Sequence, residues 1–307
     1  MLFSILIANY NNTRYLDSAL ASLQAQTCQD WEVILVDDAS TDNFEEVITG
    51  WRRDERIKVF RNGRNEGCGY TKRRCAELAS GSLLAFLDPD DALDPGALAI
   101  MAEAHAQHPE CSLIHSTHYI CDPQLQVKQV AGYPRPLPEG VPYLLLNDGS
   151  IHHFVTFKKA CYLATEGLSP ANRAAVDQDL YYKLEETGGV FYIDKPLYYY
   201  RIHEGSISNA GKERAASLWH YSIIMEACLR RMKNGRKEQK KIYRARYYKA
   251  RIFRSFRQRK YMDFLYSLMI FPFAGGWDNL MSYFGKLPKE GAALIRRSLV
   301  DDYEIKV

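Results

Sequence analysis

The stretch SLLAFLDPDDALDP, residues 82–95, joins an apolar run directly to a group of acids. Residues 83–87 are all apolar, which predicts a short strand over 82–88 that is buried on both faces. Three carboxylates follow at once, and Pro95 begins a predicted helix over 95–107. A buried strand that ends in polar residues and leads into a helix is typical of α/β proteins.

The same alternation runs through the first 120 residues. Apolar runs predict further strands at 2–8, 31–38, 57–60 and 111–116, and helical spacing predicts helices at 15–26, 43–51 and 68–79. Strands that alternate with helices indicate a Rossmann-like, mostly parallel sheet flanked by helices. In such sheets ligands bind beyond the carboxyl ends of the strands. The acids that end the strands at 31–38 and 82–88 are therefore expected to converge at one edge.

The remaining chain divides into two parts. Residues 122–150 contain five prolines and little periodicity, which predicts a long loop or lid, and helix-like and strand-like runs follow up to about residue 209. We expect a first domain at 1–209, with one half at about 1–120 and a second half at about 121–209. Residues 210–307 are predicted to form a basic, helical C-terminal extension.

Composition favours a globular protein of a reducing compartment. The 307 residues are 47% hydrophobic and 25% charged, and the seven cysteines include no CxxC pair. The first residues lack a basic signal-peptide region, and no apolar run is long enough to cross a membrane. These features predict a cytoplasmic location.

The net charge of +3 hides a strong asymmetry. Residues 228–260 contain 15 Lys or Arg and one Glu, a balance of +14, so the rest of the chain carries +3 − 14 = −11. Aromatic residues lie between these cations at helical spacing, a pattern that suits an anionic membrane surface. A solvated helix face, or a helix that pairs with an acidic protein surface, would have the same composition.

The acids after the strand at 82–88 predict a metal site. Carboxylates this close repel one another unless a cation compensates them, and Mn²⁺ or Mg²⁺ prefers oxygen ligands. Asp88 and Asp90 flank Pro89, so both side chains can lean toward one ion. The alternative is an ordinary acidic turn in which Asp94 caps the next helix.

Three stretches before residue 185 also carry candidate residues, and each has an ordinary structural alternative. They are VILVDDAS (33–40), whose Asp38 could accept hydrogen bonds from a nucleobase or ribose; NGRNEGCGYTKRRC (62–75), whose Lys72, Arg73 and Arg74 could meet phosphates; and AVDQDLYYKL (175–184), whose Asp177 or Asp179 could act as a base or cap a helix. The basic stretch matches neither GxxxxGK[ST] nor GxGxxG. In YYYRIHEGSIS (198–208), Arg201 and His203 share one strand face and could meet a diphosphate or the metal.

Taken together and in this order, these stretches resemble the inverting family 2 glycosyltransferases of the GT-A fold, which build bacterial surface polysaccharides. The matching elements span about residues 3–208 and include SILIANYNN, WEVILVDDASTD, NEGCGYTKRRC, LLAFLDPDDAL, VDQDL and YYYRIHEGSIS. The resemblance implies a hexosyl- or N-acetylhexosaminyltransferase that uses a nucleotide-sugar donor, with UDP as the favoured nucleotide, and Mn²⁺ or Mg²⁺.

The resemblance also implies roles for the donor-binding residues. The aromatic residue that packs on the nucleobase is Tyr10, and Ala8 replaces the usual proline of the first turn. Asp38, with Asp37 beside it, is implied to touch uracil and ribose, and Arg73 to contact the nucleotide.

The same resemblance implies which residues hold the metal, lie near the diphosphate and act as the base. Asp88 and Asp90 are implied to hold the metal beside the nucleotide diphosphate, and Arg201 and His203 to lie near that diphosphate. The family's catalytic base belongs to a Glu-Asp pair, whose Glu is Val176 here. This change leaves Asp177 as the expected base and Asp179 as its rival.

The expected acceptor is a hydroxyl of a glycan or of a lipid-linked sugar, so we expect peripheral attachment to the inner face of the plasma membrane through residues 228–260. No nucleic acid is expected as a partner. The main alternative is a basic nucleic-acid- or membrane-binding module without activity, which leaves the acid clusters unexplained. A sugar nucleotidyltransferase would carry a glycine-rich basic loop after the first strand, and ANYNNTRY is no such loop.

Overall fold

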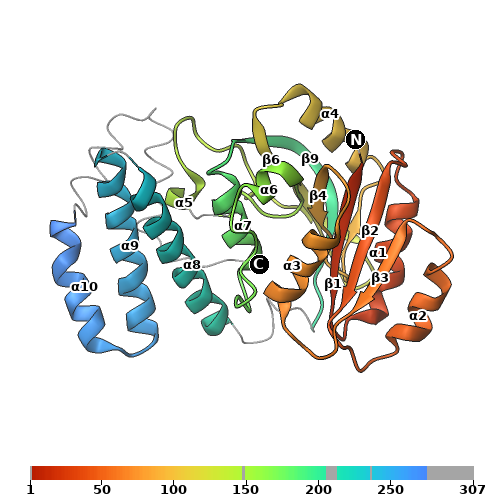
Figure 1. Ribbon diagram of the computed structural model, residues 1–307, viewed down its shortest axis with the longest axis horizontal. Coiled ribbons are helices and arrows are strands. Elements are labelled where there is room, and N and C mark those ends of the chain that lie inside the picture. The colour runs from red at the N-terminus through yellow and green to blue at the C-terminus, as the bar shows by residue number, and fades with distance from the viewer. Residues whose placement is uncertain (1, 147–148, 205–212, 236, 275–307) are drawn as a thin grey trace. The chain divides into compact units, whose positions relative to one another are not determined.

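The computed structural model describes residues 2–146, 149–204, 213–235 and 237–274 (Figure 1). The chain contacts itself in two compact units. The first consists of 1–136, 151–176 and 183–206, and the second of 137–150, 177–182 and 207–307. The predicted border between domains at 209–210 lies outside the described residues.

One sheet organises the first unit. Its strands are β1 (Phe3–Asn9), β2 (Trp31–Asp37), β3 (Ile57–Arg61), β4 (Leu83–Phe86), β5 (Ala92–Leu93), β6 (Cys111–Cys121), β7 (Val127–Val130), β8 (Val155–Lys158) and β9 (Gly189–Arg201). Their order is β3-β2-β1-β4-β8-β6-β9-β5, and β7 pairs with β6. The pairs β1–β2, β2–β3, β1–β4 and β6–β9 are parallel, whereas β8 runs antiparallel between β4 and β6. The α/β fold class predicted from the alternation is confirmed.

Helices cover both faces of the parallel block. They are η1 (Thr13–Tyr15), α1 (Leu16–Gln24), α2 (Phe44–Trp51), α3 (Cys68–Leu78), α4 (Ala97–Gln107) and α6 (Lys159–Leu163). Apolar residues of α1, α2 and α4 form one core with alternate residues of β1, β2 and β4, such as Phe3, Ile5 and Ile7. The helix α3 contacts β1 and β2 from the other side (Figure 1). Because both faces are covered, these strands are apolar at nearly every position.

Two stretches differ from the sequence prediction. The stretch 122–150, predicted as a loop or lid, contains β7 and the short helix α5 (Tyr143–Leu146). The strand-like run VFYI, residues 190–193, is the beginning of the longer strand β9, which continues through Pro196 to Arg201. Register shifts against β6 accommodate this long strand, including one between Ser116 and Thr117, which pair with Ile193 and Pro196.

The second unit is helical, as predicted. It contains α5, residues 177–182 of α7 (Val176–Leu184), α8 (Glu213–Asn234), α9 (Lys237–Arg257) and α10 (Tyr261–Phe273). The helix α9 packs between α8 and α10 (Figure 1). Among the described residues, no helix combines the length and the apolar character needed to span a membrane. All seven cysteines are described, and each is a free thiol.

Buried histidines predict a loss of stability in mild acid. His115 on β6 is fully buried, and burial lowers its pKa from 6.5 to about 3. At pH 5 the unfolded chain binds a proton that the folded chain excludes, so the free energy of unfolding falls by about 2 kcal/mol for this residue between pH 7 and pH 5. In urea unfolding at both pH values, His115→Leu should lose about 2 kcal/mol less than the wild type. Equal losses would contradict this account.

Candidate active site

The sheet register brings the predicted acids to one edge. In the parallel pair β1–β2, Asn9 lies opposite Asp37, and both end their strands. The strand β4 is the other parallel neighbour of β1, and it ends at Phe86, two residues before Asp88. The carboxyl ends of these three strands therefore meet, as the alternation predicted, at the edge where α/β sheets bind ligands.

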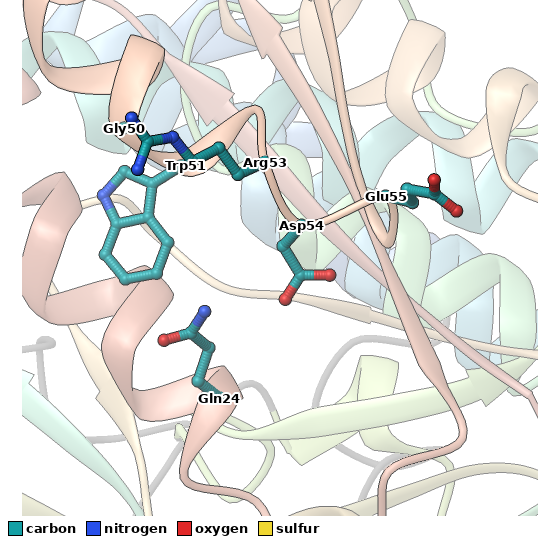
Figure 2. Close-up of a pocket in the computed structure, with 6 residues that line it drawn as sticks. All are labelled: Gln24, Gly50, Trp51, Arg53, Asp54 and Glu55. Atoms are coloured by element: carbon teal, nitrogen blue, oxygen red, sulfur yellow. The ribbon is translucent and has the colours of Figure 1, made fainter.

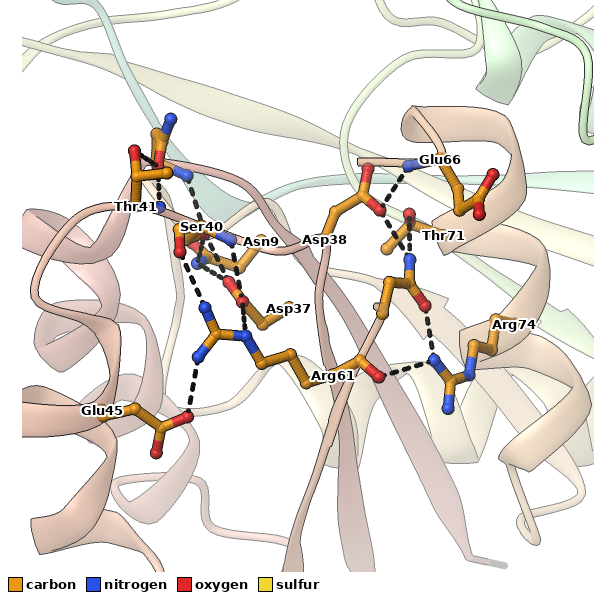
Figure 3. A network of polar contacts seen from close by, with 12 residues as sticks. Asn9, Asp37, Asp38, Ser40, Thr41, Glu45, Arg61, Glu66, Thr71 and Arg74 are labelled. Atoms are coloured by element: carbon orange, nitrogen blue, oxygen red, sulfur yellow. Dashed lines mark hydrogen bonds and ion pairs between the residues drawn. The ribbon is translucent and has the colours of Figure 1, made fainter. Parts of the chain in front are cut away.

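Asp37 anchors the first loops of this edge (Figure 3). Its carboxylate is fully buried and accepts hydrogen bonds from Asn9 Nδ2 at 3.0 Å, from the Ser40 N–H at 3.0 Å and from the Ser40 hydroxyl. The Arg61 guanidinium lies 3.4 Å away and continues to the carbonyl of Ser40 at 2.8 Å and to Glu45 at 3.2 Å. Asp37 thus holds the turn after β2 in shape.

Asp38 is also engaged within the protein, and it is only 3% exposed. Its carboxylate accepts a hydrogen bond from the backbone N–H of Glu66 at 2.9 Å (Figure 3). It also accepts from Asn62 Nδ2 at 2.6 Å and from the backbone N–H of Gly67 at 2.8 Å. Gly67 has φ +93°, which favours glycine. The predicted contact of Asp38 with uracil or ribose stays a prediction, and it would use a carboxylate that already accepts these three bonds.

A buried lysine faces the predicted metal site. The Lys72 ammonium on α3 lies 3.2 Å from Asp88 Oδ1 and 5.0 Å from the centre of the Phe86 ring. The Lys72 side chain is 7% exposed and that of Asp88 is 34% exposed. Burial acts to raise the pKa of Asp88, but the Lys72 charge, with other neighbours, outweighs burial and holds this pKa below its ordinary value.

Arg73, the predicted nucleotide contact, is engaged within the protein. Its guanidinium binds Glu77 at 2.8 Å and the carbonyls of Glu166 and Leu168 at 3.3 and 3.1 Å, and its contact with a nucleotide stays a prediction. The buried cation of α3 is its neighbour Lys72. A signal was present, because Lys72 lies three and four residues before the buried Cys75 and Ala76 and so shares their helix face.

Asp90 pairs with His203. The Asp90 carboxylate lies 2.9 Å from His203 Nε2, and Arg14 on η1 lies 3.3 Å from His203 Nδ1. The Asp90 side chain is 19% exposed, whereas that of His203 is 5% exposed. The Tyr15 ring covers the imidazole at a centroid distance of 4.7 Å. The structure thus joins Asp90 with His203, which are 113 positions apart in the chain.

The Arg201 side chain holds the acidic turn by a hydrogen bond to the backbone of that turn. Its guanidinium donates to the carbonyls of Asp90 and Pro123, both at 2.6 Å, and to the Ser18 hydroxyl at 2.7 Å. These contacts account for Nε, Nη1 and Nη2, and the residue is 5% exposed. The predicted approach of Arg201 to a diphosphate stays a prediction. The structure places Arg201 beside the turn that carries Asp90.

Asp91 is the most enclosed acid of the turn. It is 1% exposed and accepts hydrogen bonds from the Tyr198 hydroxyl at 2.7 Å and from the Arg201 N–H at 2.8 Å. Burial, and then the charges of Asp90 and Asp88, raise the pKa of Asp91 well above its ordinary value. Asp91 therefore supports the turn rather than offering a free charge.

Histidines that the sequence left without a role lie beside Asp88. Ligand atoms of Asp88, Asp91 and His153 lie within 4.8 Å of one another, which makes them a possible metal-binding group among the described residues. His153 stacks on Tyr198 at 5.0 Å, and its carbonyl lies 3.1 Å from His118 Nδ1. Burial, and then His118, lower the pKa of His153 to about 3, so its imidazole is neutral and able to coordinate.

The other predicted residues lie at element ends. Tyr10 follows β1 directly and is 47% exposed, and Ala8 lies near the end of the same strand. An exposed aromatic residue here is available to stack on a base.

Asp177 and Asp179 lie in the first turn of α7 and belong to the second unit. Asp179 is 2% exposed, and Asp177 is half-buried.

A separate polar pocket of about 520 Å³ lies at the opposite edge of the sheet (Figure 2). It is lined by Gln24, Gly50, Trp51, Arg53, Asp54 and Glu55. These residues lie at the ends of α1 and α2 and before β3, where strands begin, and none of them is a predicted site residue. The position argues against a substrate site in this sheet.

A mostly parallel sheet with carboxylates, a buried lysine and a histidine at its carboxyl edge defines a nucleotide-binding type of α/β domain. The sequence profile of glycosyl transferase family 2 matches residues 4–161, just over half of the chain. The chain therefore belongs to glycosyl transferase family 2. The family resemblance stated from the sequence is confirmed.

Relatives with similar sequences carry glycosyltransferase names. An uncharacterized glycosyltransferase of Nostoc sp. is 29% identical over 212 residues, which cover 66% of this chain and 65% of that protein. Chondroitin synthase of Escherichia coli is 27% identical over 229 residues, 75% of this chain but 33% of the synthase. The chain thus matches less than two thirds of either relative.

Solved structures of similar fold include two that hold a nucleotide sugar. S. aureus TarS in complex with UDP-GlcNAc aligns with a TM-score of 0.69 over 97% of this chain and 87% of that chain, at 16% identity. Mannosyltransferase PcManGT of Pyrobaculum calidifontis, in complex with GDP-Man and Mn²⁺, aligns with a TM-score of 0.57 over 96% of this chain and 78% of that chain, at 13% identity. The similarity confirms the predicted GT-A fold.

Proposed function

We propose that this glycosyltransferase is a metal-dependent, inverting enzyme that transfers a sugar from a UDP-sugar to a hydroxyl of a glycan or lipid-linked acceptor in cell-surface polysaccharide synthesis. The observation that carries the proposal is the convergence of Lys72 with Asp88 and of His203 with Asp90 at the carboxyl edge of β4. The fold shared with TarS bound to UDP-GlcNAc supports UDP as the nucleotide.

The residues of the acidic turn fit a divalent cation. Asp88 and Asp90 keep 34% and 19% of their side chains exposed, and imidazoles of His203 and His153 lie beside them. Carboxylate oxygens with imidazole nitrogen suit Mn²⁺, which the PcManGT structure contains. When bound, the ion neutralises charge on the leaving diphosphate. Asp88 and Asp90 would hold it, and His203 is placed to join them.

The chain's own residues supply the other parts of a single displacement. Asp177 takes the proton of the acceptor hydroxyl, whose oxygen then bonds to the anomeric carbon on the face opposite the nucleotide. The bond from that carbon to the diphosphate oxygen breaks, and the nucleoside diphosphate leaves with the electron pair. Lys72 is the buried cation that stabilises this leaving anion, and Tyr10 stacks on the base. General-base assistance of this kind contributes about 10²–10⁴-fold.

The proposal includes peripheral attachment to the inner face of the plasma membrane. The cations of residues 228–260 would bind anionic headgroups there, at about 1 kcal/mol for each cation near the surface. Lipid-linked acceptors are held at the same surface, so attachment would raise their local concentration. Family membership supports an enzyme over the alternative of a basic binding module.

Thermal unfolding with UDP-, GDP- and dTDP-sugars, with and without Mn²⁺, tests the donor. A UDP-sugar with Mn²⁺ at about 100 times its Kd should raise the Tm by about 5–10 °C, because ligand binding stabilises the folded state by about 2.7 kcal/mol. Lys72→Met should lose most of this shift relative to its own ligand-free Tm. Arg73→Met is the matched control, because Arg73 binds Glu77 instead. Equal shifts in the two variants, or no shift with any donor, would contradict the proposal.

A further inference from the structure

The outer surface of α10 is apolar and exposed. The helix has 13 residues, of which only Asp263 is charged, and its side chains Ser267 and Phe271 are buried. Seven of its large apolar residues are about half exposed or more, and they are Tyr261, Met262, Leu265, Tyr266, Leu268, Met269 and Phe273. Five of them, at 262, 265, 266, 269 and 273, have the spacing of one helix face. A soluble protein rarely exposes so many apolar side chains together unless they bind something.

The helix that packs against α10 is rich in cations. The adjacent helix α9 carries nine Lys or Arg and one Glu, and its exposed Lys237, Lys241 and Arg244 repeat at helical spacing. Arg259 and Lys260, also exposed, directly precede α10.

One cation of α9 reaches α10 itself. The Arg251 guanidinium lies 3.3 Å from Asp263 and 5.2 Å from the centre of the Tyr266 ring. Positive charge thus borders the apolar surface.

We propose that α10 lies in the interfacial layer of an anionic membrane, with its exposed apolar face among the acyl chains and the neighbouring cations at the lipid phosphates. This inference rests on the membrane attachment proposed above and deepens it, because it names the element that inserts. An apolar helix face with cations at its border matches both layers of such a surface. A nucleic acid would use the cations but not the apolar face.

Vesicle binding by the full chain tests the inference. The probes are phosphatidylcholine vesicles with and without phosphatidylglycerol, at low and at high salt. The triple variant Met262→Ser, Met269→Ser, Phe273→Ser should partition at least about tenfold less onto anionic vesicles and keep only salt-sensitive binding. The matched control is Val127→Ser, Val130→Ser, Leu163→Ser, which removes three exposed apolar residues from the first unit and should bind as the wild type does.

A second readout separates insertion from simple attraction. A tryptophan introduced by Phe273→Trp should be quenched by brominated acyl chains, and one introduced by Leu163→Trp should not. We call the variant Met262→Ser, Met269→Ser, Phe273→Ser the apolar triple variant. Suppose that it binds vesicles normally and that binding is abolished by the charge reversals Lys237→Glu, Lys241→Glu, Arg244→Glu. Attachment is then electrostatic, and the proposed insertion of α10 is wrong. A changed oligomeric state of the apolar triple variant in sedimentation, with unchanged vesicle binding, would show a protein partner instead.

Membrane binding through α10 can be tested separately from sugar transfer. The apolar triple variant should transfer sugar to a water-soluble acceptor at the wild-type rate, since α10 contributes no residue to the proposed chemistry. Loss of that activity would count against the independence of the two functions and against this inference. Normal activity with unchanged vesicle binding would overturn the inference alone and leave the proposed glycosyl transfer intact.

Discussion

Asp90→Ala should lower kcat/KM for sugar transfer by at least about 10³-fold, because stabilisation of the departing diphosphate is worth several kcal/mol. Asp90 is the more enclosed of the two accessible acids and the one that pairs with His203 at 2.9 Å. Without it, His203 loses the carboxylate at Nε2, and Asp88 remains as the more exposed carboxylate of the turn. Calorimetry should show donor binding that no longer depends on Mn²⁺.

The control for this change is Asp122→Asn. Asp122 is a carboxylate on the same unit, and its partner is Lys128 at 2.7 Å. This variant should keep both turnover and the Mn²⁺ dependence of donor binding. Turnover of Asp90→Ala within a few-fold of wild type, with Mn²⁺ dependence retained, would remove Asp90 from the metal site and favour the group of Asp88, Asp91 and His153.

Asp177→Asn should reduce kcat by about 10²–10⁴-fold and leave the Kd of the donor unchanged, since only proton removal from the acceptor is lost. Asp177 lies in the first turn of α7 and is half-buried, so its carboxylate is accessible. Single-turnover rates and donor calorimetry measure the two quantities separately. Asparagine keeps the size of the side chain and its ability to accept a hydrogen bond at a helix start.

Asp179→Asn decides between the two rival acids. Asp179 is 2% exposed, so its substitution should lower the thermal stability of the protein more than that of Asp177 does, and should change kcat less. A larger loss of kcat in Asp179→Asn, at equal stability, would transfer the role of base to Asp179. Normal turnover by both variants would show that the catalytic base does not lie on α7.

The parallel block and its acidic edge were predictable because each rests on a local pattern. Strands β1, β2 and β4 are apolar at nearly every position, and parallel neighbours place their carboxyl ends together whatever the details of packing. The acids at 37–38 and 88–91 were therefore assigned correctly to one edge of the sheet.

What escaped the sequence depends on helix phase and on distant pairing. The inward cation is Lys72 and not Arg73, because α3 begins at Cys68 and turns residue 72 onto the face of Cys75. His153 reaches Asp88 only because β8 inserts antiparallel between β4 and β6, and no local pattern specifies that partner. The strand β9 is one continuous strand across Pro196, and register shifts in its pairing with β6 accommodate its length.

The three hydrogen bonds of Arg201 have a consequence for the order of events on the ribosome. Its guanidinium donates hydrogen bonds to residues 18, 90 and 123. Three earlier parts of the chain are therefore joined by a side chain that is translated after all of them. Domains fold as their segments emerge, and the strands up to β8 are available before this residue leaves the exit tunnel. In the newborn protein, the turn that carries Asp90 therefore gains this link only after the strands up to β8 have been made.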